Sequence, residues 1–235
     1  MRTKTVGVNR DISFLYTLIG KWHKDIRKGR VKTMDVMAVL SGESGSGKST
    51  LLQALLDRYP DQFRCQTLTT TRKPNHNDAV HPLNTSFSEY CYVSDSTFNS
   101  FVERRIIALA QESVRSSNGY RFGVLQSTLD NTLAFDGCVV ANVPPTVYAE
   151  MWSYYRLYKR PVCGIYLDVP EELAYERLLR RGLAPDEARA RRSLAFGWRA
   201  LAEHLGYTFI KNPDEEGGVP HRAMEAFLEI VHSQY

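Results

Sequence analysis

The segment from Gly42 to Thr50 limits the fold of this chain more than any other feature. It reads Gly-Glu-Ser-Gly-Ser-Gly-Lys-Ser-Thr and matches the pattern G-x-x-x-x-G-K-[ST]. A short apolar run, residues 36–40, comes directly before it, and apolar residues at helical spacing follow it through Leu56. Glycine lets the backbone wrap around a phosphate group, and the positive end of the following helix favours the anion. Strand, loop and helix in this order predict a nucleotide-binding phosphate loop.

The rest of the chain continues the alternation of strand and helix. Residues 138–143 and 162–169 read as buried strands, each followed by a helical segment, and residues 207–211 read as a last short strand. Together with the phosphate loop, this pattern predicts an α/β fold of the P-loop NTPase class, in which a parallel sheet carries helices on both faces. We place this domain at residues 35–235. The polar and aromatic segment at about 69–131 breaks the alternation and is predicted to be an insertion.

Residues 1–34 are predicted to form a basic extension. They hold nine Lys or Arg against Asp11 and Asp25, which leaves a net charge of −3 for the rest of the chain. Apolar residues between Ile12 and Ile26 recur at three- and four-residue spacing, which predicts an amphipathic helix. Such a helix either packs on the domain or contacts a partner, a membrane or a nucleic acid, and its role stays open. Because the positive charge is confined to the extension, we do not expect the domain to bind nucleic acid.

Several function classes are excluded by what the sequence lacks. No run approaches the roughly 20 apolar residues of a membrane-spanning helix, and the N-terminus has no signal-peptide pattern. The four widely spaced cysteines form no CxxC or Cys/His pattern, so we expect buried free thiols rather than disulfides or a zinc site. These observations lead us to expect a soluble, cytoplasmic protein.

The phosphate loop assigns roles to its own residues. Lys48 is expected to reach the β- and γ-phosphates of ATP as a cation whose side chain is otherwise solvated, and the Ser49 hydroxyl is expected to ligate Mg²⁺. The predicted ATP-binding residues of the loop are Gly42, Glu43, Ser44, Gly45, Ser46, Gly47, Lys48, Ser49 and Thr50. The loop alone does not distinguish a kinase from a GTPase or another ATPase.

Motifs outside the loop resemble guanylate kinase over about residues 35–232. Thr70-Thr71-Arg72-Lys73-Pro74 is similar to the family's TTR-x-P turn, Tyr90-Cys91-Tyr92-Val93-Ser94 to its Y-x-F-V-S strand, and Asn118-Gly119-Tyr120-Arg121-Phe122-Gly123 to its G-N-Y-Y-G segment. The resemblance implies a P-loop NTPase fold of the nucleoside monophosphate kinase type, whose insertion binds an acceptor that already carries a phosphate. The acceptor-binding residues that it implies are Arg72 and Tyr90, on the phosphate, Glu112, on guanine, and Phe122.

Three arginines extend the resemblance. Arg177, Arg181 and Arg192 match the family's R-x-x-x-R followed by a third Arg. Arg177 and Arg181 share one helix face, and guanidinium groups can clamp the oxygens on which charge spreads during phosphoryl transfer. A solvated basic helix face is the alternative interpretation. The resemblance makes these arginines catalytic together with Lys48, places them in a helical lid at about 176–200, and puts Asn212 beside the adenine of ATP.

The chain departs from the guanylate kinase pattern in its acceptor-binding positions. Asn75 stands where the family usually has a second phosphate-binding Arg, Val124 replaces a Ser or Thr, and Ala141-Asn142-Val143 replaces a D-x-D. Missing partners would leave donors of guanine unpaired, at roughly 1–3 kcal/mol each. We therefore expect ATP-dependent phosphoryl transfer to a nucleoside monophosphate, with GMP a poor acceptor.

Two other functions stay open. Val140-Ala141-Asn142 and residues 118–124 resemble the ribose 1,5-bisphosphate phosphokinases, a branch of the same superfamily. The second alternative is a non-catalytic guanylate kinase-like interaction module, although such modules usually lose the phosphate loop that this chain retains. The sequence names neither the acceptor nor the oligomeric state.

Overall fold

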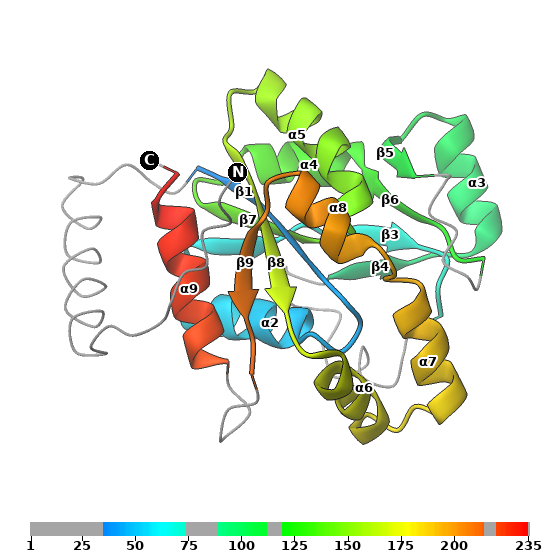
Figure 1. The fold of residues 1–235 in the computed structure, drawn as a ribbon. Helices are drawn as coiled ribbons and strands as arrows, with labels where there is room; N and C mark the ends of the chain where they lie inside the picture. Colours follow the sequence, from blue (N-terminus) through cyan, green and yellow to red (C-terminus); the bar gives the residue numbers. More distant parts are fainter. Residues whose placement is uncertain (1–34, 74–88, 112–118, 214–219, 235) are drawn as a thin grey trace.

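The computed structural model describes residues 35–73, 89–111, 119–213 and 220–234, and two sheets organise them (Figure 1). The larger sheet has five strands in the order β2-β7-β1-β8-β9, and every neighbouring pair is parallel. These strands are β1 (Met37–Gly42), β2 (Phe63–Cys65), β7 (Cys138–Asn142), β8 (Val162–Asp168) and β9 (Thr208–Lys211). The four strands predicted from apolar runs are present, and β2 is an additional edge strand.

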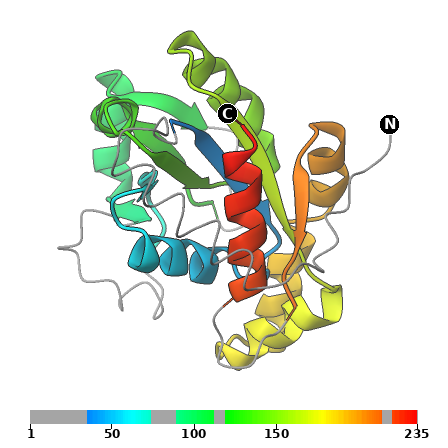
Figure 2. The same cartoon turned by 90° about the vertical axis from the view of Figure 1, so that its left-hand side faces the viewer.

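Helices cover both faces of this sheet. Successive residues of a strand point to opposite faces, so Ala38 and Leu40 of β1 pack in one apolar cluster and Met37 and Val39 in the other. The first cluster is closed by α2 (Lys48–Arg58) and α9 (His221–His232), which lie side by side in Figure 2. The second is closed by α4 (Gln126–Leu133), α5 (Tyr148–Leu157), which follows the short helix η2 (Pro145–Val147), and α8 (Trp198–His204). The predicted α/β class is confirmed.

A smaller sheet is built from the region of the predicted insertion. Its strands, in spatial order, are β4 (Tyr90–Tyr92), β3 (Leu68–Thr70), β6 (Phe122–Leu125) and β5 (Ile107–Gln111). The pair β3 and β4 is parallel, and the other two pairs are antiparallel. Helix α3 (Asp95–Glu103) begins at Ser94, whose hydroxyl caps it by accepting from the Thr97 amide, and it buries Phe98. That this sheet binds the acceptor stays a prediction.

The carboxyl ends of the parallel strands point toward α6 (Glu171–Arg180) and α7 (Pro185–Ser193), which pack on each other (Figure 1). Gly182, with φ of +84°, provides the turn between them. Open α/β sheets bind their ligands at this edge, outside the carboxyl ends of the strands. The fold therefore brings α6 and α7 to the edge where a nucleotide site is expected.

Some expectations meet the structure only in part. Residues 1–34, with the predicted amphipathic helix, lie outside the described residues. All four cysteines are free, and Cys65, Cys138 and Cys163 are buried as expected, but Cys91 is exposed, so the expectation of a buried thiol is wrong there. Among the described residues, no helix is long and apolar enough to cross a membrane.

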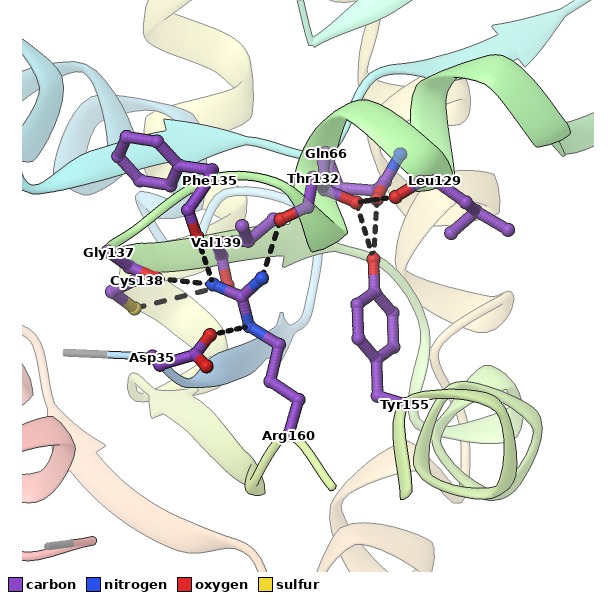
Figure 3. Close-up of polar contacts among 10 residues, drawn as sticks. All are labelled: Asp35, Gln66, Leu129, Thr132, Phe135, Gly137, Cys138, Val139, Tyr155 and Arg160. Carbon is purple, nitrogen blue, oxygen red and sulfur yellow. Dashed lines mark hydrogen bonds and ion pairs between the residues drawn. The ribbon is translucent and has the colours of Figure 1, made fainter. Parts of the chain in front are cut away.

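A buried arginine, Arg160, lies at the amino ends of β1, β7 and β8, opposite to the carboxyl ends of the strands (Figure 3). Arg160 is 3% exposed, and its guanidinium donates to the carbonyl oxygens of Thr132 at 2.5 Å, Phe135 at 3.2 Å and Gly137. Its Nε lies 2.9 Å from Asp35 Oδ1, an ion pair by distance that does not meet hydrogen-bond geometry. Arg160 thus donates hydrogen bonds to backbone carbonyls in the last turn of α4 and in the segment that connects α4 to β7.

Replacing Arg160 by Met should destabilise the protein strongly, because the carbonyl groups of Phe135 and Gly137 would lose their donor and that of Thr132 would lose one of two. We expect the free energy of unfolding in urea to fall by about 3–5 kcal/mol, with little change in the dependence on urea concentration. Asp35→Asn is the matched control, because the Asp35 side chain is 59% exposed and its loss should change the stability by less than about 1 kcal/mol. Equal losses in the two variants would show that the ion pair, rather than the carbonyl contacts, stabilises this edge.

Candidate active site

The phosphate loop connects the end of β1 to the start of α2, and its glycines are required by packing as well as by conformation. Gly45 and Gly47 have φ of +89° and +94°. A Cβ at Gly45 would lie 2.4 Å from the carbonyl oxygen of Ala174 on α6. A Cβ at Gly47 would lie 2.5 Å from Nδ2 of Asn212, just after β9. The loop is therefore pressed against two other elements, which leaves no room for side chains at these positions.

Two of the predicted site residues hold the loop from outside. Asn212 Nδ2 donates to the Ser46 carbonyl at 2.6 Å. Arg177 donates to the carbonyls of Gly45 at 3.3 Å and Ser46 at 3.4 Å, and its second amino group donates to the Asn212 carbonyl at 3.0 Å. These contacts satisfy the outward-facing carbonyls of the loop, so its amide groups can turn inward toward an anion.

Lys48 lies inside the loop. Its Nζ donates to the carbonyl oxygens of Gly42 and Glu43, both at 2.8 Å, and lies 3.4 Å from Ser46 Oγ. The expectation of a solvated side chain is wrong, because Lys48 is half-buried and bonded to the backbone. Burial lowers the pKa of Lys48 to about 8, and the nearby Glu89 carboxylate opposes this shift.

Ser49, at the start of α2, lies beside a carboxylate. Its hydroxyl donates to Glu89 Oε2 at 3.1 Å, and Asn142 Nδ2 donates to Oε1 of the same group. Hydroxyl, carboxylate and amide oxygens are the hard ligands that Mg²⁺ prefers, usually together with substrate phosphates and waters. The described residues contain no group of three or more His, Cys, Asp or Glu that could hold a metal by themselves. The oxygen ligands present therefore fit a magnesium ion that is bound together with a nucleotide.

Arg177 donates hydrogen bonds to the loop, whereas Arg181 and Arg192 act on loop residues through their charge. Arg181 is exposed, its side chain has no hydrogen-bond or ion-pair partner in the described part of the chain, and its charge acts on Lys48 by Coulomb repulsion. Arg192 of α7 forms an ion pair with Glu171. Burial raises the pKa of Glu43 in the loop, and the positive charge of Arg192 opposes this rise. The two arginines thus lie within electrostatic range of the loop, while Arg177 supports it.

The structure gathers three of the four predicted acceptor residues on the smaller sheet. The Arg72 guanidinium lies 4.7 Å from the centre of the Tyr90 ring and donates to the Tyr92 hydroxyl at 3.2 Å. The Phe122 ring lies 6.4 Å from that of Tyr90. A guanidinium held by aromatic rings suits an anion such as a phosphate. Glu112, the fourth residue, lies outside the described residues.

Two positions that depart from the guanylate kinase pattern belong to the core. Val124 is 3% exposed and Ala141 is fully buried, and both pack in the apolar cluster beneath α4, α5 and α8. The third departure, Asn75, lies outside the described residues. The structure therefore has apolar packing where the pattern has a hydroxyl and a carboxylate.

One residue of the site has no motif of its own. Glu89 contacts Ser49 and Asn142, and its carboxylate is also hydrogen-bonded to the Tyr90 hydroxyl, whose pKa is raised by burial and then by Glu89. Its one signal in the sequence is its place directly before the segment that matches Y-x-F-V-S. Its partners are 40 and 53 residues away in the chain, so the contacts themselves depend on the fold.

A parallel sheet with a phosphate loop at the end of its central strand, and arginines from the following helices around that loop, defines a P-loop kinase. A family model described as guanylate kinase matches residues 34–148. The chain is 26% identical to a guanylate kinase of Helicobacter pylori over 199 residues, which cover 83% of this chain and 85% of that protein. It is 29% identical to a guanylate kinase of Mycoplasma mobile over 149 residues, 61% of this chain and 68% of the other.

The fold has the same relatives. The crystal structure of guanylate kinase from Anaplasma phagocytophilum matches with a TM-score of 0.55 over 85% of each chain, at 17% identity, a level at which the likeness concerns the fold. The family model and the curated relatives support a guanylate kinase-like P-loop kinase, as the motifs around Lys48, Arg72 and Tyr90 predict.

The lowered pKa of Lys48 should make nucleotide affinity depend on pH. A triphosphate favours the ammonium form, so the affinity for ATP with Mg²⁺ should be constant below a pH of about 8 and fall as the pH rises through that value, by up to about tenfold per pH unit. Isothermal titration calorimetry from about pH 7 to pH 9.5 measures this dependence. Lys48→Arg keeps its charge over the whole range, so its affinity should not vary with pH. A flat wild-type profile would contradict the expectation.

Proposed function

We propose that this protein transfers the γ-phosphoryl group of ATP to a nucleoside monophosphate. The observation that carries the proposal is the arrangement around Lys48, where the phosphate loop, the Ser49 hydroxyl with a carboxylate beside it, and the charge of Arg181 come together. The similarity to guanylate kinases supports ATP-dependent nucleoside monophosphate kinase activity. It does not distinguish one acceptor from another.

Positioning and neutralisation of charge carry the reaction in this proposal. An oxygen of the acceptor's phosphate attacks the γ-phosphorus, the bond to the bridging oxygen breaks, and ADP leaves with that electron pair. The nucleophile is already an anion, so no side chain is assigned as a general base. Lys48 exchanges its loop carbonyls for phosphate oxygens, and Arg181 and Arg192 face the oxygens on which charge spreads.

Other residues bind and orient the donor. Arg177 and Asn212 keep the loop in shape, and Asn212 Oδ1, which is buried and has no hydrogen-bond partner in the described part of the chain, can accept a hydrogen bond from the adenine amino group. A magnesium ion, when bound, neutralises charge between the β- and γ-phosphates. Ser49 is the ligand that the loop offers to it.

For the acceptor, we propose that Arg72 binds the phosphate against the rings of Tyr90 and Tyr92, and that GMP is a poor acceptor. The apolar packing of Val124 and Ala141 supports the second point, because neither side chain can pair with a donor of guanine. Glu112 argues against it, since a carboxylate there could accept from the guanine ring N–H and amino group. The two effects are of similar size, so a direct measurement has to decide.

The acceptor is tested by a coupled assay of ADP release with GMP, dGMP, AMP, dTMP, dCMP and ribose 1,5-bisphosphate. We expect kcat/KM for GMP not to exceed that for the best other monophosphate by more than about 10²-fold. If GMP leads by more, and Glu112→Gln removes the lead, the protein is a guanylate kinase with an altered pocket. Turnover of ribose 1,5-bisphosphate alone would favour the phosphokinase. An absence of both turnover and thermal stabilisation by ATP with Mg²⁺ would favour the interaction module.

Arg192→Ala should lower kcat by about 10²-fold or more and leave the affinity for ATP nearly unchanged, because its charge is needed chiefly in the transition state. Arg189→Ala is the matched control, since Arg189 lies on the same helix, pairs with Asp186 and is 61% exposed. The control should keep the wild-type kcat. Steady-state kinetics together with calorimetry separate the two effects, and an unchanged kcat in Arg192→Ala would assign that residue to the solvated face of α7.

A further inference from the structure

The Glu89 carboxylate joins three parts of the molecule. Ser49 of the phosphate loop and α2 donates to Oε2 at 3.1 Å, Asn142 at the end of β7 donates to Oε1, and the Tyr90 hydroxyl of β4 is bonded to the same group. Three side-chain donors on one half-buried carboxylate fix its orientation. The Glu89 carboxylate is thereby held directly beside the Ser49 hydroxyl of the phosphate loop.

The place next to the loop is one where P-loop enzymes need an acidic residue. In P-loop NTPases Mg²⁺ is held by the Ser or Thr of the loop and by an Asp on a neighbouring strand. Two strands, β8 and β7, pair with β1. Asp168 at the end of β8 forms an ion pair with Arg199 at 3.3 Å, whereas β7 sets Asn142 opposite Leu40. The last residues of β7 offer no carboxylate, since Ala141 is fully buried, Asn142 is an amide, and Val143 is 5% exposed in the core.

Glu89 supplies the missing charge from another element. Its carboxylate accepts a hydrogen bond from Asn142 Nδ2, so it lies next to the side chain at the end of β7. It also acts on Lys48 by Coulomb attraction, which places it within electrostatic range of the phosphate site. Because Mg²⁺ keeps several waters when it is bound with a nucleotide, a carboxylate beside the Ser49 ligand can accept hydrogen bonds from those waters.

We propose that Glu89 is the positioning residue of the magnesium site, which orients the Ser49 hydroxyl and the metal-bound waters in place of a carboxylate on β7, and that Asn142 and Tyr90 hold it there. This inference rests on the proposed use of ATP with Mg²⁺. A purely structural role for Glu89, as a link between the smaller sheet and the loop, is the competing explanation.

The test measures how much Mg²⁺ strengthens ATP binding, as the ratio of the dissociation constants without and with saturating Mg²⁺ in isothermal titration calorimetry. In Glu89→Gln this ratio should fall by about tenfold or more, as is usual when a hydrogen-bonding partner of a metal ligand is removed. Binding of ATP without Mg²⁺ should stay the same or become tighter, because one negative charge near the triphosphate is gone. Glu150→Gln, an exposed carboxylate on α5, is the control and should keep the wild-type ratio.

A swap variant separates the charge from the side chain that carries it. Glu89→Gln combined with Asn142→Asp exchanges amide and carboxylate across the same hydrogen bond, and it should restore most of the Mg²⁺ effect. The thermal unfolding temperature of each variant without nucleotide checks that it is folded.

Each other outcome is decisive. A wild-type Mg²⁺ effect in Glu89→Gln overturns the proposal, and so does a weakening of ATP binding that is equal with and without Mg²⁺, which is the result expected of a structural link. A folded swap variant that recovers nothing also overturns it, because the position of the charge would then not matter. If the wild-type protein binds no ATP under either condition, the proposed kinase function itself fails, and this inference fails with it.

Discussion

The contact of the phosphate loop with α6 and with the residue after β9 is the constraint on which the site depends. Gly45 lies against the Ala174 carbonyl and Gly47 against Asn212, at distances where any side chain would collide. Both glycines also have positive φ. The glycines of the motif are thus required twice, by the turn of the loop and by the elements packed around it. A nucleotide-binding loop held in this way is preorganised, so little conformational entropy is lost when phosphates bind.

This constraint gives the three arginines different roles, although they form one motif in the sequence. Arg177 bonds to the loop backbone and to Asn212, so part of its contribution is present before any phosphate binds. Arg192 reaches the region from α7 and is balanced by Glu171. Arg181 lies near Lys48, where two like charges repel each other until an anion neutralises them. Residues of one sequence motif therefore differ in how many of their contacts are already formed in the folded protein.

The larger sheet could be predicted from the sequence because its strands are fully buried and read as apolar runs, as in Val36–Leu40. The edge strand Phe63–Cys65 has three residues and gave no such signal. The strands of the smaller sheet are short and mix polar with aromatic residues, so their pairing depends on tertiary contacts. Loop residues were predictable because their spacing is local. Glu89 was not, because its meaning comes from two distant partners.

The apolar packing at Ala141 and the position of the Glu89 carboxylate are physically related. A carboxylate at position 141 would lie in a fully buried apolar cluster, where an unpaired charge is strongly unfavourable. Glu89 is half-buried and accepts hydrogen bonds from three side-chain donors, so its carboxylate is not left unpaired. Because the carboxylate is at position 89 and not at position 141, the apolar cluster beneath α4, α5 and α8 contains no charge there, and the phosphate loop still has an acidic neighbour. In this arrangement position 141 can be apolar without removing the charge beside Ser49.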